Sequence, residues 1–211
     1  MRILYTLIIG SFLQAHARRQ VSGQQTILSV CDFCQNQLTL QDLLPLFSYF
    51  RLKGRSRCCQ QKLPISYLFS ELLSLVLGIL FSLETYSFFK ILLCFSLYYN
   101  IWLDYYTQYL SYPLLLLAWG YALGKPTFSF LHLVFIFFLC LASLLHQLGW
   151  GDTILLSALL VRYDIILFNG ILLVSSLLAL LFYSFIKKDQ REIPFGPFIC
   201  VVFLGLLYII P

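Results

Sequence analysis

Residues 149–152 read Gly149-Trp150-Gly151-Asp152 and place a carboxylate at the edge of a long apolar stretch. An ionised aspartate at the centre of a bilayer costs about 2.5–3.5 kcal/mol, so acids inside membrane segments are rare and usually functional. Asp104 stands at a comparable edge, with no basic residue beside it. Two such carboxylates in an apolar chain suggest aspartyl chemistry.

The composition around these acids is typical of a polytopic membrane protein. Of the 211 residues, 60% are hydrophobic and only 11% are charged, and the mean hydropathy is +0.85. A soluble protein of this length would carry more polar surface. Because a membrane helix needs about 20 apolar residues, we expect an all-α fold with about eight transmembrane helices. The candidate spans are 4–17, 65–83, 87–103, 111–124, 128–147, 153–163, 165–186 and 196–210.

The basic residues predict which side of the membrane each loop faces. Seven of the fourteen Lys and Arg lie between Arg18 and Lys62, and three more lie in 187–191. Basic residues in short loops mark the cytoplasmic side. Counting spans from a cytoplasmic segment 18–64 puts Asp104, Asp152 and both basic clusters on the cytoplasmic side of the plasma membrane. Membrane orientation therefore explains the basic segment better than nucleic-acid binding.

We expect three parts in the chain. They are a first transmembrane helix at 1–17, a cytoplasmic cysteine-containing loop at 18–64, and a transmembrane domain at 65–211. A cleaved signal peptide is the alternative for the first part, because Ala15-His16-Ala17 is similar to a small-residue cleavage site. Cleavage there would put the basic segment outside, against the charge rule.

Four of the seven cysteines lie in the expected loop: Cys31, Cys34, Cys58 and Cys59. Thiols on the cytoplasmic side are normally reduced, so a structural disulfide is not expected. Thiolates at C-x-x-C spacing can bind zinc tetrahedrally, but the second half of such a site reads Ser56-Arg57-Cys58-Cys59, and adjacent cysteines chelate poorly. A zinc site and a small folded loop with incidental thiols both stay open.

Several motifs, taken in their order and spacing, resemble the type IV prepilin peptidases, the A24 family of aspartyl proteases. The resemblance covers nearly the whole length and is nearest to the Gram-positive competence form. Gly149 to Asp152 matches the family's G-x-G-D motif. The other similar segments are Gly10–Leu13, Cys31–Cys34, Asp42–Pro45, Gly54–Cys59, Ser66–Leu73 and Ile193–Phe198.

This resemblance implies a membrane aspartic endopeptidase that removes the leader peptide of type IV prepilins or pseudopilins at the cytoplasmic face. It implies that Asp104 and Asp152 are catalytic and that Gly149 and Gly151 support the motif. The expected partners are these substrates and the lipid bilayer, without nucleic acid. In such a pair one acid is ionised and one is protonated, because two like charges at short range cannot both form cheaply. Which acid is the base is not assigned, since the pair titrates as a unit.

The resemblance also bears on cofactors. Proteolysis by an acid pair requires none. Family members often N-methylate the new terminus with S-adenosylmethionine, an activity associated with the cysteine-bearing loop, where zinc would be held by Cys31, Cys34, Cys58 and Cys59. The family's third cysteine falls on Ser56 here, which puts both the four-thiolate site and the methylation in question.

Three rival interpretations stay open at this point. One is a membrane thiol oxidoreductase that uses Cys31 and Cys34. Another is a transporter or channel in which Asp104 and Asp152 line a polar path. The third concerns Asp152 alone, which could simply be the N-cap of the helix that follows, because Asp is favoured there.

Overall fold

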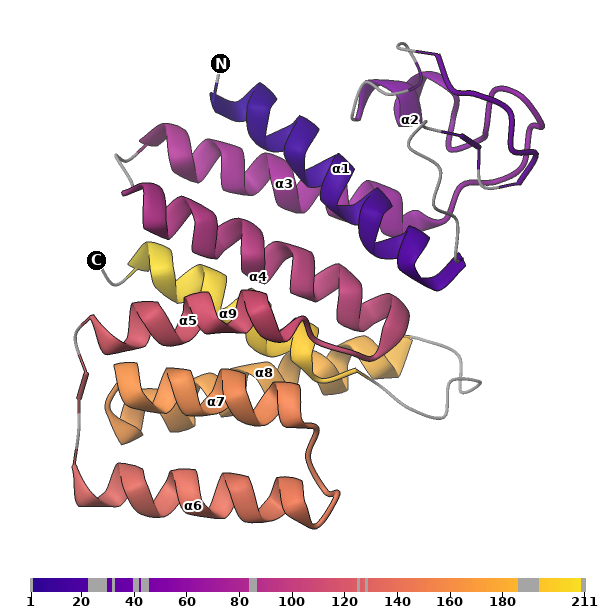
Figure 1. Cartoon of the computed structure of the whole chain (residues 1–211). Coiled ribbons are helices and arrows are strands. Elements are labelled where there is room, and N and C mark those ends of the chain that lie inside the picture. The colour runs from indigo at the N-terminus through magenta and orange to yellow at the C-terminus, as the bar shows by residue number, and fades with distance from the viewer. Residues whose placement is uncertain are drawn as a thin grey trace. The chain divides into compact units, whose positions relative to one another are not determined.

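The computed structural model describes residues 2–22, 30–31, 33–39, 42, 46–83, 87–124, 126–127, 129–185 and 194–209. The chain divides into two compact units, Met1–Tyr86 and Ser87–Pro211, and each is described by itself. The described residues are mostly α-helical (Figure 1). The expected all-α fold is therefore confirmed.

Two long helices form the body of the first unit. Helix α1 (Arg2–Ser22) packs along α3 (Ile65–Leu83). The close approach depends on Gly78, because a Cβ atom built there would overlap Thr6 Oγ1 and lie 3.0 Å from Ile3 Cα. The Arg2 guanidinium donates a hydrogen bond to the carbonyl of Phe81 at 3.0 Å, which ties the start of α1 to the end of α3.

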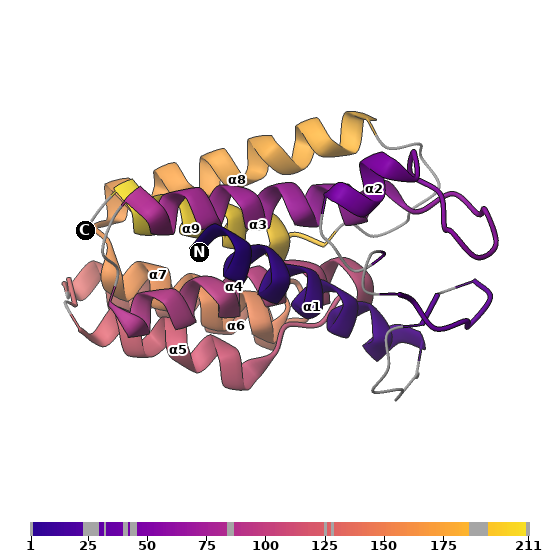
Figure 2. The ribbon, with the colours of Figure 1, turned by 90° about the horizontal axis from the view of Figure 1, so that it is seen from above.

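The cysteine-bearing segment connects these two helices. It contains one short helix, α2 (Phe47–Arg51), and two isolated antiparallel bridges, Val30↔Gln37 and Arg55↔Lys62. Figure 2 shows α2 and the loops around it at the end of the pair where α1 finishes and α3 begins. The Leu46 N–H donates to the Glu71 carboxylate at 2.8 Å, so the segment is anchored to the first turns of α3.

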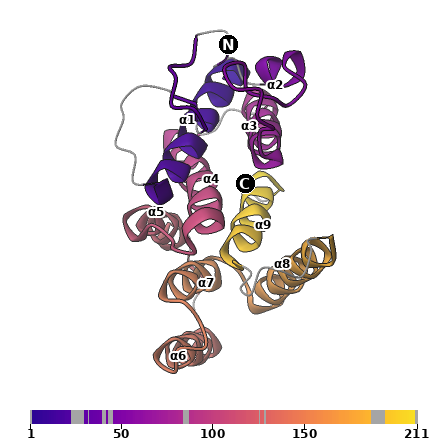
Figure 3. The same cartoon turned by 90° about the vertical axis from the view of Figure 1, so that its right-hand side faces the viewer.

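The second unit contains the remaining helices of the described chain. They are α4 (Phe88–Thr107), α5 (Tyr112–Leu123), α6 (Phe130–Leu144), α7 (Trp150–Arg162), α8 (Ile165–Phe185) and α9 (Gly196–Ile209). In the end-on view of Figure 3, α7 lies between α5 and α6, and α9 lies between α4 and α8. The helices thus form a layered bundle in which α6 and α8 each have an outward face.

Local sequence explains where several of these helices begin and end. The Ser87 hydroxyl accepts a hydrogen bond from the Lys90 N–H at 3.3 Å and caps α4, as serine commonly does. Pro113 stands in the first turn of α5, where its missing N–H is not needed. Ser129 and His132 form a reciprocal cap at the start of α6. Helix α4 ends at Gln108, which adopts a left-handed φ of 57°.

Each expected span contains a helix, but several boundaries differ from the expectation by a few residues; α4, for example, ends at Thr107 and α6 at Leu144. Helix α1 continues past residue 17 to Ser22, and α7 begins at Trp150 rather than at 153. By length and composition, two of the described helices could cross a membrane, Ile65–Leu83 and Ile165–Phe182. The apolar helices α5, α6 and α9 are shorter. The number of spans stays a prediction.

Gly78 offers a test of the α1–α3 packing. We expect Gly78→Ala to destabilise the protein by about 1–3 kcal/mol, because the added methyl group must push α1 away. Gly170→Ala in α8 is the matched control, since a Cβ there meets nothing within 4 Å. The control should gain up to about 1 kcal/mol from helix propensity. The thermal midpoints of the purified variants measure the difference, and equal midpoints would contradict the packing.

Candidate active site

Asp104 lies in the last turn of α4, and its residue is only 6% exposed. Aromatic rings surround this end of the helix. The Trp102 ring centroid lies 5.9 Å from that of Tyr105 and 6.1 Å from that of Tyr106. The backbone N–H of Gly196 donates a hydrogen bond to the Asp104 carboxylate. The carboxylate is therefore held between the end of α4 and the start of α9.

Asp152 lies in the first turn of α7 and is half-buried. The N-cap of this helix is Gly149, which has extended backbone angles, φ −67° and ψ 141°. Thr153 donates to the Gly149 carbonyl from both its N–H and its hydroxyl, each at 3.0 Å. An N-cap role for Asp152 is thus wrong, because the residue stands three positions too late. Its side chain is free of the capping task.

The two acids converge on Gly196, the first residue of α9. A Cβ atom built on this glycine would lie 2.6 Å from Asp104 Oδ2 and 3.2 Å from Asp152 Oδ1. Oxygens of both carboxylates are therefore within 3.2 Å of one point. The structure brings together the two acids that the sequence singled out, from the end of α4 and the start of α7. Gly196 is required there because any side chain would occupy the space between them.

Gly151 lets α7 approach the loop that follows Asp104. A Cβ atom on Gly151 would lie 2.8 Å from the Cβ atom of Leu110 in that loop. Asn100 holds the same loop, since its Oδ1 accepts from the Ser111 N–H at 2.7 Å. By contrast, a Cβ atom on Gly149 would meet only Asp152 Oδ2, at 3.6 Å. The two glycines of the motif therefore differ in role: Gly149 caps the helix, and Gly151 permits close packing.

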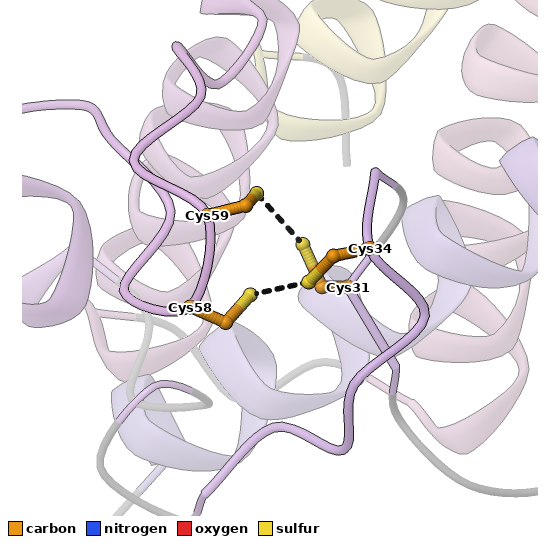
Figure 4. A group of neighbouring side chains, drawn as sticks. All are labelled: Cys31, Cys34, Cys58 and Cys59. Atoms are coloured by element: carbon orange, nitrogen blue, oxygen red, sulfur yellow. Dashed lines mark hydrogen bonds between the residues drawn. The ribbon is translucent and has the colours of Figure 1, made fainter.

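The four cysteines of the first unit form a second cluster (Figure 4). Their sulfur atoms all lie within 4.8 Å of one another. Cys34 Sγ lies 2.8 Å from Cys58 Sγ, and Cys31 Sγ lies 3.9 Å from Cys59 Sγ. The Ser56 hydroxyl oxygen is 3.2 Å from Cys31 Sγ and 3.1 Å from Cys58 Sγ. All four cysteines that the sequence proposed as metal ligands are thus brought together.

The thiols of this cluster differ in acidity. Burial raises the pKa of the Cys31 thiol, but hydrogen bonds from Ser56 and from the backbone of Cys34 and Phe33 outweigh it and lower the pKa to about 6. The hydrogen bond with Cys58 raises the pKa of Cys34 to about 12. Since the thiolate is the form that binds metal, Cys31 offers a ligand atom at neutral pH.

A cavity of about 150 Å³ lies beside the cysteines in the first unit. Its lining includes Cys31, Ser56, Arg19, Arg55, Asp42 and Glu71. Burial raises the pKa of the Asp42 carboxyl, but hydrogen bonds from Thr39 and the nearby guanidinium groups of Arg57 and Arg51 bring it below its usual value. The cavity therefore presents both an ionised acid and several cations.

Comparison with known proteins finds similarity to one family. The family model described as "Bacterial Peptidase A24 N-terminal domain" matches residues 4–85, nearly the same span as the first unit. A "Prepilin leader peptidase/N-methyltransferase" of Vibrio cholerae is 26% identical over 98% of this chain and 89% of its own. These comparisons support membership of the type IV prepilin peptidases.

Two further relatives agree with this membership. A "Type 4 prepilin-like proteins leader peptide-processing enzyme" of Escherichia coli is 26% identical over 96% of this chain and 91% of its own. A "Prepilin leader peptidase/N-methyltransferase" of Pectobacterium carotovorum is 40% identical, but over only 23% of this chain and 17% of its own. No solved structure matches the chain significantly.

Sequence reasoning missed the part that Gly196 takes in this site. The residue lies within the segment Ile193–Phe198, which resembles the family's last-loop motif, yet nothing in that pattern says which residue faces the acids. The sequence shows only a glycine at the start of an apolar helix, which by itself does not indicate a role in the site. Its meaning depends on the contact with two residues that are far away in the sequence.

The unequal roles of Gly151 and Gly149 can be tested with one substitution made at both. We expect Gly151→Ser to destabilise the protein by about 1–3 kcal/mol, because the new side chain collides with Leu110. Gly149→Ser should stay within about 0.5 kcal/mol of the parent, since serine is a good N-cap residue. Thermal midpoints compare the two. A larger loss of stability in Gly149→Ser than in Gly151→Ser would contradict the packing role of Gly151.

Proposed function

We propose that this chain is a membrane aspartic endopeptidase that cleaves the leader peptide of type IV prepilins or pseudopilins. The observation that carries the proposal is the convergence of Asp104 and Asp152 on Gly196. The names of two relatives that align along nearly the whole chain suggest the substrate class. The motif resemblance further suggests the Gram-positive competence form of the enzyme.

The proposed reaction uses the two carboxyl groups as one unit. The ionised carboxylate takes a proton from water, and the water oxygen attacks the scissile carbonyl carbon. The protonated carboxyl group gives its proton to the carbonyl oxygen as the C–O bond gains single-bond character. Collapse of the tetrahedral intermediate then breaks the C–N bond. The leaving amine takes the proton that the first carboxyl group received from water, and a hydroxyl group of the intermediate returns its proton to the second carboxylate. Asp104 and Asp152 exchange roles in this cycle, and no cofactor is required.

We propose that the eight helices other than α2 cross the membrane. The outward faces of α6 and α8 support this, because they carry many exposed large apolar side chains, which water would disfavour. On α6 they include Phe130, Leu133, Phe137, Phe138 and Leu144, and on α8 Ile166, Leu173, Leu177, Leu180 and Leu181. If every helix from α3 to α7 crosses the membrane in turn, the end of α4 and the start of α7 come out on the same side of the membrane as the basic segment between α1 and α3. The charge rule makes that side cytoplasmic, and residues 65–211 then form the membrane-embedded protease domain.

The cysteine-bearing segment at 18–64 is proposed as the cytoplasmic part of the enzyme. Its four thiols fit a structural zinc ion, which would stabilise the local fold by linking both halves of the loop. The N-methyltransferase names of two relatives suggest a second activity with S-adenosylmethionine as methyl donor. We propose that the cavity beside the cysteines binds the amino-acid portion of that molecule; the acidic Asp42 and Glu71 and the basic Arg19 and Arg55 in its lining support this.

Substitution of either acid tests the peptidase directly. We expect Asp104→Asn and Asp152→Asn each to lower the rate of prepilin cleavage by about 10²–10⁴-fold, the usual size of a general acid–base contribution. Asp164→Asn is the matched control, since that acid is exposed at the start of α8. Cleavage is measured by the shift in size of a co-expressed prepilin.

The same assay separates the rival functions. Parental cleavage in either Asp104→Asn or Asp152→Asn would overturn the aspartyl mechanism. Loss of cleavage in Cys31→Ser together with full activity in both Asp variants would favour the thiol oxidoreductase. A transporter predicts no cleavage by the parent protein at all.

Gly196 provides a second test through positioning alone. We expect Gly196→Ala to lower cleavage by about 10²-fold, because the added methyl group displaces Asp104 Oδ2 from a contact of 2.6 Å. Gly205→Ala on the same helix is the control, since a Cβ there meets nothing within 4 Å. Equal activity of the two variants would mean that the acids do not act across Gly196.

A further inference from the structure

The cysteine segment contains two turns that are built alike. In the first, the Cys31 N–H donates to the Asn36 carbonyl at 2.9 Å, and the Gln35 N–H donates back to the Cys31 carbonyl at 2.9 Å. Gln35 has a left-handed φ of 59°. The isolated bridge Val30↔Gln37 closes this turn. We call residues 30–37 the first knuckle.

The second turn repeats every one of these features. The Ser56 N–H donates to the Gln61 carbonyl at 2.8 Å, and the Gln60 N–H donates back to the Ser56 carbonyl at 3.0 Å. Gln60 has a left-handed φ of 57°. The isolated bridge Arg55↔Lys62 closes the turn. Residues 55–62 are therefore a second knuckle in the same conformation.

The match between the knuckles fixes which positions correspond. Ser56 takes the place of Cys31, and Cys59 takes the place of Cys34. The extra cysteine, Cys58, stands where the first knuckle has Phe33. The second knuckle therefore lacks its first sulfur ligand and carries an additional sulfur one residue before its second.

The sulfur of Cys58 lies where a third metal ligand is needed. Tetrahedral zinc–thiolate bonds of about 2.3 Å put neighbouring sulfur atoms about 3.8 Å apart. Cys31 and Cys59 already meet that spacing at 3.9 Å. Cys34 and Cys58 are closer, at 2.8 Å, and both are more exposed than the buried Cys31.

We infer that the two knuckles hold one zinc ion whose third thiolate comes from Cys58, and that Ser56 is a positioning residue that donates its hydroxyl proton to a bound thiolate. The buried Ser56 oxygen is within 3.2 Å of both Cys31 Sγ and Cys58 Sγ, and its single proton serves one of them at a time. The inference rests on the zinc site of the proposed function and adds its ligand assignment. The competing arrangement uses the Ser56 oxygen itself as the ligand and leaves Cys58 outside.

Exchange of the two side chains tests the assignment. The full chain carrying Asp152→Asn is purified, so that metal binding is read independently of proteolysis. Zinc per chain, the zinc dissociation constant and the charge-transfer absorption of the Co²⁺-loaded protein are measured. We compare Cys58→Ser, Ser56→Ala and the double variant Ser56→Cys/Cys58→Ser, which restores the cysteine pattern of the first knuckle without changing the number of thiols.

We expect one zinc per chain in the parent and thiolate-to-Co²⁺ absorption from four sulfurs. Cys58→Ser should weaken zinc binding more than about 100-fold and lose the absorption of one thiolate. Ser56→Ala should keep that absorption but weaken binding about 10–100-fold, the usual effect of losing a hydrogen bond to a metal ligand. The double variant should return both affinity and absorption close to the parent, which also shows that the loop still folds.

Four results would overturn the inference. They are parental binding and absorption in Cys58→Ser, loss of the metal in Ser56→Ala with a change of absorption, a double variant that does not recover, and a parent that binds no zinc. None of them touches the peptidase, because prepilin cleavage is assayed separately in the chain that retains Asp152. Conversely, an inactive peptidase that binds zinc as expected would leave the ligand assignment standing.

Discussion

The second unit depends on one close contact, in which Gly196 lies against the carboxylates of Asp104 and Asp152. For this contact to exist, α4 must end, and α7 and α9 must begin, at the same end of the bundle. The glycine supplies a backbone N–H to Asp104 and no side-chain volume. A single carbon atom added to Gly196 would fill the space between the acids. The three helix ends can therefore meet in this way only because residue 196 has no side chain.

The helix ends also stabilise the carboxylates within an apolar bundle. The first N–H groups of a helix have no partner within it, so the starts of α7 and α9 present donors where the carboxylates gather. Some buried polar side chains elsewhere in the second unit have local partners. Asn100, for example, bonds within α4 and to the loop that follows it. The two carboxylates therefore lie together at one end of the bundle, while α6 and α8 turn apolar faces outward.

The sequence predicted what depends on composition and on single residues. Helices formed in all the apolar segments, and the two isolated acids met. It did not predict where α7 begins, because the glycines at 149 and 151 are poor helix formers, and only the structure shows one as a cap and the other as a packing site. Gly196 was missed for a stronger reason. Its role exists only in relation to Asp104 and Asp152, and no local pattern encodes a contact among three distant segments.

The repeat of the knuckle cannot be recognised in the sequence, because Ser56 stands where the second knuckle would have its first cysteine. With Ser56 in place of a cysteine, the sequence shows one C-x-x-C motif and an adjacent cysteine pair, which chelates poorly when both sulfurs must come from one turn. In the fold the pairs form across the knuckles instead: Cys58 faces Cys34 and Cys59 faces Cys31 (Figure 4). The sulfur atoms of the adjacent Cys58 and Cys59 nevertheless lie within 4.8 Å of each other and of the other two. The conformation of the second knuckle therefore brings consecutive cysteines to one site, which the spacing in the sequence argued against.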